Sequence, residues 1–196
     1  MDKIHLSRIL SKLDRPSRNI LGLEQYVTDV SAAVDFLFFV DAAGMIESKD
    51  IADLGCGTGI LGLGAGLLGA KHVDMYDIDK KMLEICTRNV ASASAGNCSV
   101  HDEDLFDVLR HYDVVISNPP FGFQSDFDIE TFILHVRKIA DNFFFLYKDN
   151  HRINGLSEKY ALQCEHFGDL HLDASAPFHR RRRYPLPAVI VYSCKG

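Results

Sequence analysis

The chain lacks the long apolar run that a membrane-spanning helix requires. Such a helix takes roughly 18 or more consecutive apolar residues, and the most apolar window here, residues 32–40, is interrupted by Asp35. The N-terminus, Met1-Asp2-Lys3-Ile4-His5, also lacks the apolar core of a signal peptide. We therefore expect a cytoplasmic protein that does not associate with membranes.

Cysteine pairs at a metal-binding or redox spacing are also missing. The five cysteines are an odd number, and no Cys-x-x-Cys occurs. This excludes a zinc knuckle and a disulfide framework, and it favours reduced thiols. The patterns G-K-[ST] and H-E-x-x-H are absent too, so the sequence indicates neither a phosphate loop nor a metal site.

A strongly basic composition is missing as well, because the formal net charge is −6. Nucleic-acid binding is not excluded by this value, since electrostatic footprints are local. Residues 1–20 are locally basic, and consecutive arginines occur at Arg180, Arg181, Arg182 and Arg183. Such a run cannot wholly face acidic partners on the same molecule, so we predict phosphate contacts. A solvated charged loop beside an edge strand is the alternative.

What the chain does contain is an alternation of strand and helix patterns. Its 196 residues, 47% of them hydrophobic, suffice for one domain with a single core. Strands are predicted at 50–54, 72–77, 98–101, 112–117, 142–147, 169–173 and 188–193. Helices are predicted at 3–14, 28–43, 59–69, 79–94, 129–141 and 156–166, with Thr28 capping the second.

Successive strands joined by helices require a parallel, doubly wound α/β sheet. The last two predicted strands have no helix between them and should pair antiparallel. We therefore predict a Rossmann-like fold, with a mostly parallel sheet of about seven strands and an antiparallel edge hairpin at the C-terminus. Residues 1–45 are expected to form a helical segment over the ligand site, and residues 46–196 the Rossmann-like core of the same domain.

A glycine-rich turn, residues 53–59 (DLGCGTG), lies between a predicted strand and the next helix. Glycine permits a tight turn and a close approach of backbone N–H groups to a ligand, although this pattern alone also suits a dinucleotide or a plain turn. The carboxylate of Asp53 would repel a pyrophosphate, but it suits a ligand with an ammonium and a sulfonium, such as S-adenosylmethionine. We predict cofactor contacts at Asp53, Gly55, Gly57, Thr58, Gly59 and Ile60.

Acidic residues also follow the next two strands. Asp77 ends the strand at 72–77, and a carboxylate at this place commonly binds both ribose hydroxyls. Ile78 beside it would pack on the adenine ring; a helix cap is the alternative role for Asp77, but Asp79 already fits that role. Asp104 and Leu105 follow the third strand, where a carboxylate and a backbone amide would bind adenine. A solvated acidic loop is the alternative there.

The loop Asn118-Pro119-Pro120-Phe121, followed by Gly122, begins where the strand at 112–117 stops. Ligands bind at this carboxyl edge of open α/β sheets, and the prolines leave rigid carbonyl acceptors. An exocyclic amine is a poor nucleophile because its lone pair is delocalised. The Asn118 side-chain oxygen and the Pro119 carbonyl would accept its two hydrogens and favour a pyramidal nitrogen, while Phe121 stacks on the planar target. The two motifs together predict methyl transfer to a planar amino nitrogen.

These residues resemble the motifs of class I S-adenosylmethionine-dependent N6-adenine methyltransferases. More narrowly, the chain is similar to the methyltransferase-like protein 5 family of archaeal and eukaryotic ribosomal RNA adenine-N6 methyltransferases. The similarity covers residues 23–28 (LEQYVT), 53–59, 76–79 (YDID), 118–122 (NPPFG) and the Phe-His pair before the arginines. Val27 replaces the family's usual proline.

The resemblance implies that Gln25 and Thr28 cover the methionine end of the cofactor, whose product is S-adenosyl-L-homocysteine. It implies adenine in small-subunit ribosomal RNA as the substrate. In eukaryotes it also implies a small zinc-binding activator protein that pairs with an edge strand.

Other functions remain open from the sequence. A protein-glutamine methyltransferase usually has tyrosine after Pro-Pro and a larger N-terminal helical domain, whereas Phe121 stands here. Methylation of guanine N2 or of DNA adenine is also compatible with the loop. An inactive methyltransferase fold that serves as a binding subunit is disfavoured by the intact Asp53, Asp77 and Asn118.

Overall fold

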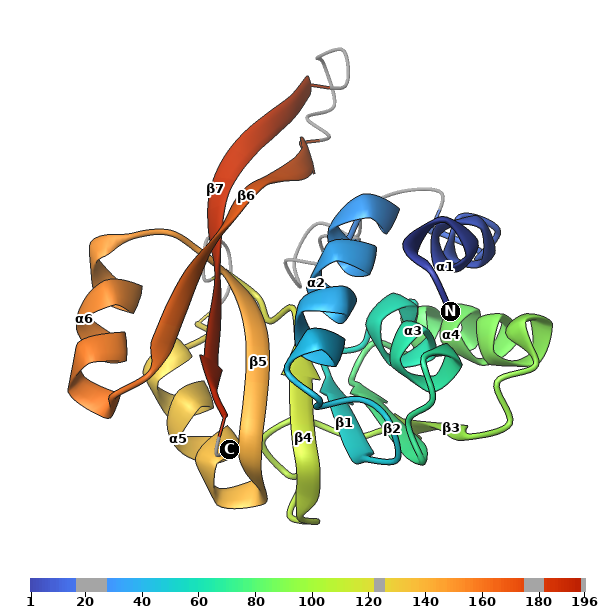
Figure 1. The fold of residues 1–196 in the computed structure, drawn as a ribbon, viewed down its shortest axis with the longest axis horizontal. Helices are drawn as coiled ribbons and strands as arrows, with labels where there is room; N and C mark the ends of the chain where they lie inside the picture. Colours follow the sequence, from blue (N-terminus) through green and yellow to red (C-terminus); the bar gives the residue numbers. More distant parts are fainter. Residues whose placement is uncertain (17–27, 122–125, 175–181, 195–196) are drawn as a thin grey trace.

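A seven-stranded sheet runs through the molecule in the order β3-β2-β1-β4-β5-β7-β6 (Figure 1). The computed structural model describes residues 1–16, 28–121, 126–174 and 182–194. The strands are β1 (Asp50–Leu54), β2 (His72–Asp77), β3 (Cys98–Asp102), β4 (Tyr112–Ser117), β5 (Ala140–Lys148), β6 (Gln163–Ala174) and β7 (Arg182–Ser193). The first five are parallel, and β7 is antiparallel to both β5 and β6. The predicted Rossmann-like sheet with its C-terminal hairpin is confirmed.

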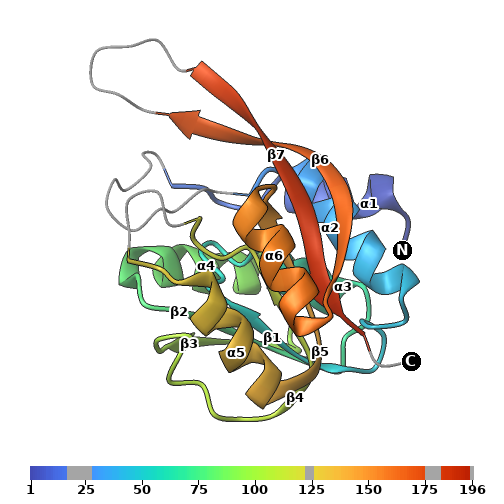
Figure 2. The same ribbon diagram turned by 90° about the vertical axis from the view of Figure 1, so that its left-hand side faces the viewer.

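Helices cover both faces of this sheet. They are α1 (Lys3–Leu10), α2 (Val30–Ala42), α3 (Ile60–Leu67), α4 (Lys80–Ala93), α5 (Ile129–Ile139) and α6 (His151–Tyr160). Figures 1 and 2 show α5 and α6 on one face and α1 to α4 on the other. The connection from β3 to β4, residues 103–111, contains no helix. No helix of the described residues is long and apolar enough to cross a membrane.

Three helix predictions were wrong in detail. The helix predicted at 3–14 ends at Leu10. Asp29, not Thr28, caps α2, because its carboxylate accepts a hydrogen bond from the Ala32 N–H at 3.0 Å. The helix predicted at 156–166 instead spans His151–Tyr160. Asn150 caps its start, and Ala161 ends it in the left-handed conformation with φ 52°. The last predicted helical residues therefore belong to β6, where they pair with β7.

The register of the parallel strands brings three strand ends to one edge of the sheet. Leu54, the last residue of β1, pairs with Ser117 of β4 and with Tyr76 of β2. Gly55 and Asn118, which follow β1 and β4, and Asp77, the last residue of β2, therefore emerge side by side. The edge is the one at which ligands bind in open α/β sheets.

The hairpin of β6 and β7 extends beyond this edge. Lys148, the last residue of β5, pairs with Ala188, so residues 182–187 of β7 continue past β5 and pair with β6. Figure 1 shows this hairpin arm projecting from the body of the sheet. The arm stands on the side of the molecule where β1, β2 and β4 end.

Candidate active site

The glycine turn after β1 is bound to the end of β2 by its backbone. The N–H groups of Gly55 and Cys56 both donate to the Tyr76 carbonyl at 2.9 Å. Gly55, Gly57 and Gly59 have φ of 72°, 55° and 84°, in the left-handed region that favours glycine. At Gly59 an added Cβ would also lie 2.6 Å from the Cys86 sulfur, so packing as well as backbone conformation requires glycine there.

Asp53 is a buried carboxylate with one unsatisfied oxygen. Its side chain lies at the end of β1 and the residue is 1% exposed. Its Oδ2 accepts from the Gly62 N–H of α3 at 2.8 Å, whereas Oδ1 is buried without a partner among the residues that the structure describes. Burial raises the pKa of Asp53 to about 7, against the lowering effect of the Gly62 hydrogen bond. A cationic donor placed here would satisfy Oδ1 and stabilise the charged carboxylate.

Asp77 orients the same turn from the end of β2. Its Oδ2 accepts from the Gly57 N–H at 2.7 Å and its Oδ1 from the Asp79 N–H at 2.9 Å. Burial raises the pKa of Asp77 despite these hydrogen bonds. Asp79 caps α4 through the N–H groups of its first turn, so Asp77 is not the helix cap. Ile78 between them is 52% exposed, which leaves an apolar surface for a flat ring.

The acidic loop after β3 lies against α5. The Asp104 carboxylate accepts from the Phe106 N–H at 2.9 Å. His135 of α5 forms a hydrogen bond with the backbone of Leu105, and burial lowers the pKa of this imidazole. Its ring packs edge-on against Phe106 at 5.6 Å. No local pattern in the sequence marks His135, because its contacts depend on the packing of α5 on this loop.

Asn118 presents the second unsatisfied acceptor of this edge. The preceding residue, Ser117, is fully buried and donates its hydroxyl to the Leu54 carbonyl at 2.6 Å, which ties the end of β4 to β1. The Asn118 Nδ2 donates to the Thr28 hydroxyl oxygen at 2.9 Å. Within the described part of the chain, its Oδ1 is buried and has no partner.

The Pro-Pro-Phe segment packs into the body of the protein. Pro119 is buried and Pro120 half-buried. Phe121 is 1% exposed, and its ring packs edge-on against Tyr147 at 5.6 Å between centroids. The Tyr147 hydroxyl donates to the Phe121 carbonyl at 3.3 Å. Stacking of Phe121 on a substrate stays a prediction, while the structure gives this ring a packing role.

Several predicted site residues lie outside the described residues: Gln25, Gly122, Arg180 and Arg181. Arg182 and Arg183 begin β7 at the tip of the arm, where they pair with Ala174 and Asp173. Across the described ranges, no three His, Cys, Asp or Glu residues are grouped so that they could hold a metal ion. The site is therefore described by acceptors, glycine turns and one exposed apolar side chain.

The comparisons with known proteins give this arrangement a family. Residues 33–139 match the family model described as the methyltransferase small domain. The chain belongs to this methyltransferase family. The prediction of a methyltransferase from the glycine turn and the Asn-Pro-Pro-Phe loop is thus confirmed.

Relatives of this methyltransferase align over nearly the whole chain. Protein MJ0284 of Methanocaldococcus jannaschii is 31% identical, and the alignment covers 96% of this chain and 92% of the relative. The rRNA N(6)-adenosine-methyltransferase METTL5 of Danio rerio is 29% identical, with 90% and 91% covered. The solved structure of PH1948 from Pyrococcus horikoshii has a TM-score of 0.85 at 29% identity, and covers 98% of this chain and 97% of its own.

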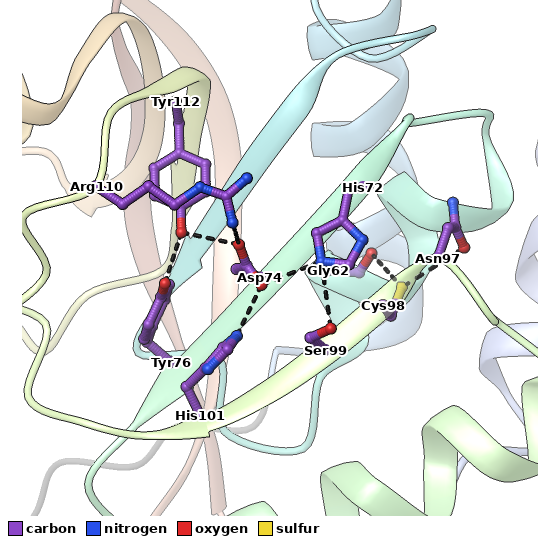
Figure 3. A network of polar contacts seen from close by, with 10 residues as sticks. All are labelled: Gly62, His72, Asp74, Tyr76, Asn97, Cys98, Ser99, His101, Arg110 and Tyr112. Carbon is purple, nitrogen blue, oxygen red and sulfur yellow. Dashed lines mark hydrogen bonds and ion pairs between the residues drawn. The ribbon is translucent and has the colours of Figure 1, made fainter.

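A second buried carboxylate, Asp74, lies on β2 of the same methyltransferase but away from this edge (Figure 3). Its Oδ1 accepts from His72 at 3.1 Å and from His101 at 2.7 Å. Its Oδ2 accepts from Arg110 at 2.6 Å and from Tyr112 at 2.9 Å. The connection from β3 to β4 contains no helix that could cover this part of the sheet. The Asp74 network lies there instead.

Proposed function

We propose that this methyltransferase transfers the methyl group of S-adenosylmethionine to the N6 amino nitrogen of adenine in RNA, and that the RNA is small-subunit ribosomal RNA. The observation that carries the proposal is the Asn118 side-chain oxygen. It is a buried acceptor without a partner among the described residues, at the edge where the cofactor turn also lies. An acceptor held in this way fits an amino group better than a hydroxyl or a carbonyl, because an amino group brings two hydrogens.

The chemistry asked of Asn118 is positioning and electrostatic stabilisation. Hydrogen bonds from the amino group to Asn118 Oδ1 and to the Pro119 carbonyl would draw the nitrogen out of conjugation with the ring. Its lone pair is then available to attack the methyl carbon, and no strong general base is needed. The two prolines fix φ, so the acceptors need little reorganisation when the substrate arrives.

The residues present fit the proposed cofactor. S-adenosylmethionine, when bound, supplies an electrophilic methyl group on a sulfonium and carries an ammonium. Asp53 Oδ1 is the buried acceptor that such an ammonium would satisfy. We assign the ribose hydroxyls to Asp77, the adenine ring to the exposed Ile78, and the adenine edge to Asp104 and Leu105. The rest of the cofactor would lie against the turn residues Gly55, Gly57, Thr58, Gly59 and Ile60.

RNA as the substrate is supported by the relatives and by the hairpin arm. The Danio rerio relative is named as an rRNA N(6)-adenosine-methyltransferase. The arm carries Arg182 and Arg183 past the end of β5, a reach of roughly 20 Å at the rise of an extended strand. We propose that the arginine run 180–183 contacts phosphates of the RNA around the target adenine.

Salt dependence tests the role of the arm. Each arginine that neutralises a phosphate contributes nearly one unit to the slope of log affinity against log salt. The double variant Arg182→Ala/Arg183→Ala should therefore bind RNA with a slope shallower by about one to two units. Arg137→Ala, at the end of α5, is the matched control, and an unchanged slope in the double variant would remove the arm from the interface.

The function itself is tested by transfer of a labelled methyl group to RNA, DNA and protein in parallel. We expect label in N6-methyladenosine of small-subunit RNA after nucleoside analysis. Label in protein glutamine, in guanine or in DNA would replace the proposed substrate while keeping the enzyme class. No transfer to any of these substrates, in the presence of bound cofactor, would favour a binding subunit.

A partner and a location belong to the same proposal. A small zinc-binding activator protein would pair with an edge strand, and β3 is the outermost strand on the cofactor side of the described sheet. Co-expression with such a protein should raise the stability of the methyltransferase and its transfer rate. The absence of a complex on size-exclusion chromatography would count against this partner. We place the activity in the cytoplasm, where small ribosomal subunits are available.

A further inference from the structure

We propose that Thr28 is a positioning residue for methyl transfer, whose hydroxyl holds the Asn118 side-chain amide in the plane that leaves Oδ1 available to the substrate. This inference rests on the proposed function in one respect, namely that Asn118 touches the target amino group. The contact between Thr28 and Asn118 is independent of that assignment.

The geometry separates Thr28 from the role that its sequence position suggests. Thr28 stands two residues before the start of α2, but the α2 cap is made by Asp29. Among the described residues, the hydrogen bond at this helix terminus is made by Asp29 and not by the Thr28 hydroxyl. That hydroxyl lies instead 2.9 Å from the Nδ2 of Asn118, although the two residues are 90 positions apart in the sequence. Thr28 is 9% exposed, so water does not readily replace this partner.

The need for such an anchor follows from the chemistry of the amide. A primary amide turns about its last side-chain bond, and this torsion is broad rather than confined to sharp wells. An unanchored Asn118 would spread its oxygen over many directions. The Thr28 hydroxyl binds one end of the amide and thereby fixes the plane in which the other end lies. The Asn118 Oδ1 is buried without a partner among the described residues, and the cost of such an unpaired acceptor is recovered when a donor arrives.

Two roles for Thr28 can be told apart by measurement. If the hydroxyl served mainly the cofactor, its removal would weaken cofactor binding. If it positions Asn118, its removal lowers the rate of transfer while cofactor affinity changes less. Misplacing a group near the reacting atoms by about 1 Å can cost on the order of 100-fold in rate, so the difference is measurable.

Thr28→Val removes the hydroxyl and keeps the shape of the side chain. We expect the fold-loss in kcat to be at least ten times the fold-loss in affinity for S-adenosyl-L-homocysteine. The affinity is measured by calorimetry on the same preparation. Thr28→Ser keeps the hydroxyl and should recover most of the rate. Thr87→Val is the matched control, because that hydroxyl donates to the Leu83 carbonyl within α4, and neither quantity should change.

A readout without substrate separates this inference from the proposed function. In the ¹⁵N-labelled protein, hydrogen exchange of the Asn118 side-chain amide should be slow, and it should accelerate in Thr28→Val. If the amide behaves so but the wild-type protein methylates no adenine, the positioning role stands and the proposed function fails. Unchanged amide exchange in Thr28→Val, or a loss of cofactor affinity with kcat retained, would overturn the positioning role.

Discussion

Two carboxylates of this protein lie on neighbouring strands and are equally hidden, yet they have opposite surroundings. Asp53 of β1 is 1% exposed and Asp74 of β2 is 2% exposed. Asp53 accepts one backbone hydrogen bond, from the Gly62 N–H, and has an oxygen without a partner among the described residues. Asp74 accepts from four side chains, two on each oxygen.

The pKa values follow this difference. Burial raises the pKa of Asp53 to about 7, because one backbone donor does not replace the lost water. Burial alone would raise the pKa of Asp74 as well, but the hydrogen bonds from His101 and Tyr112 outweigh it and leave that pKa lowered. A carboxylate that accepts hydrogen bonds on both oxygens stabilises the fold, whereas we propose that one with an unpaired oxygen, such as Asp53, is a place for a ligand. Asn118, with its own unpaired oxygen, belongs with Asp53.

The largest expected effect is that of replacing Asn118, whose unpaired side-chain oxygen we propose to contact the target amino group. Asn118→Ala should lower methyl transfer by about two orders of magnitude or more, as removal of one preorganised polar group does elsewhere. Binding of S-adenosyl-L-homocysteine, followed by calorimetry, should survive. Asn154→Ala on the exposed face of α6 is the control, and full activity of Asn118→Ala would refute the assigned chemistry.

The next effect concerns the stability of the fold and Asp74, the carboxylate that accepts hydrogen bonds on both oxygens. Asp74→Ala removes the carboxylate that His72, His101, Arg110 and Tyr112 share, and it should lower the free energy of unfolding by about 2–3 kcal/mol. This is below the range for a fully buried pair, because the Arg110 side chain is 53% exposed and can turn to water. Chemical denaturation measures it. Asp102→Ala, which breaks the exposed pair with Lys80, should cost well under about 1 kcal/mol.

A smaller effect is expected at Asp77, whose carboxylate binds backbone donors in the free protein. Asp77→Ala removes the acceptor for Gly57 N–H and the proposed ribose contact together. We expect cofactor affinity to fall by about tenfold, equivalent to one or two hydrogen bonds. Asp107→Ala, in the loop after β3, is the control for loss of a negative charge nearby, and unchanged affinity in Asp77→Ala would show that the ribose assignment is wrong.

The smallest effect is a pH dependence of cofactor affinity, which we expect from the raised pKa of Asp53. Its folded pKa of about 7 exceeds the ordinary value of 3.8. The stability contributed by the protonated group is therefore present below 3.8 and is lost as the pH rises through about 7. An ammonium ligand favours the charged carboxylate, so affinity should rise several-fold from about pH 6 to pH 8. Asp53→Asn should flatten this profile, and a flat wild-type profile would contradict the assignment.

The comparison also shows which features could be predicted from the sequence. The glycine turn, Asp77 and the Asn-Pro-Pro-Phe loop are local patterns at strand ends, and the parallel sheet follows from the alternation of strands and helices. The contact of Thr28 with Asn118 could not be predicted, because it joins distant segments whose relative placement depends on packing. The Asp74 network depends in the same way on the register of β2 with β3.

The boundary between α6 and β6 shows a different limit. Residues 156–166 have an apolar spacing that suits a helix, and no sequence pattern marks Asn150 as the N-cap of an earlier start. Pairing of Gln163–His166 with β7 decides their conformation, and such pairing is not visible in a local window. Tertiary contacts override the helical pattern here.

The most direct test titrates S-adenosyl-L-homocysteine into Asp53→Asn and Asp74→Asn by calorimetry at a pH near 8. Both changes remove one charge from a buried site and keep an acceptor of the same shape. We predict that Asp53→Asn loses at least about tenfold in affinity while Asp74→Asn binds as the wild-type protein does. Equal losses in both variants, or a loss confined to Asp74→Asn, would contradict the account.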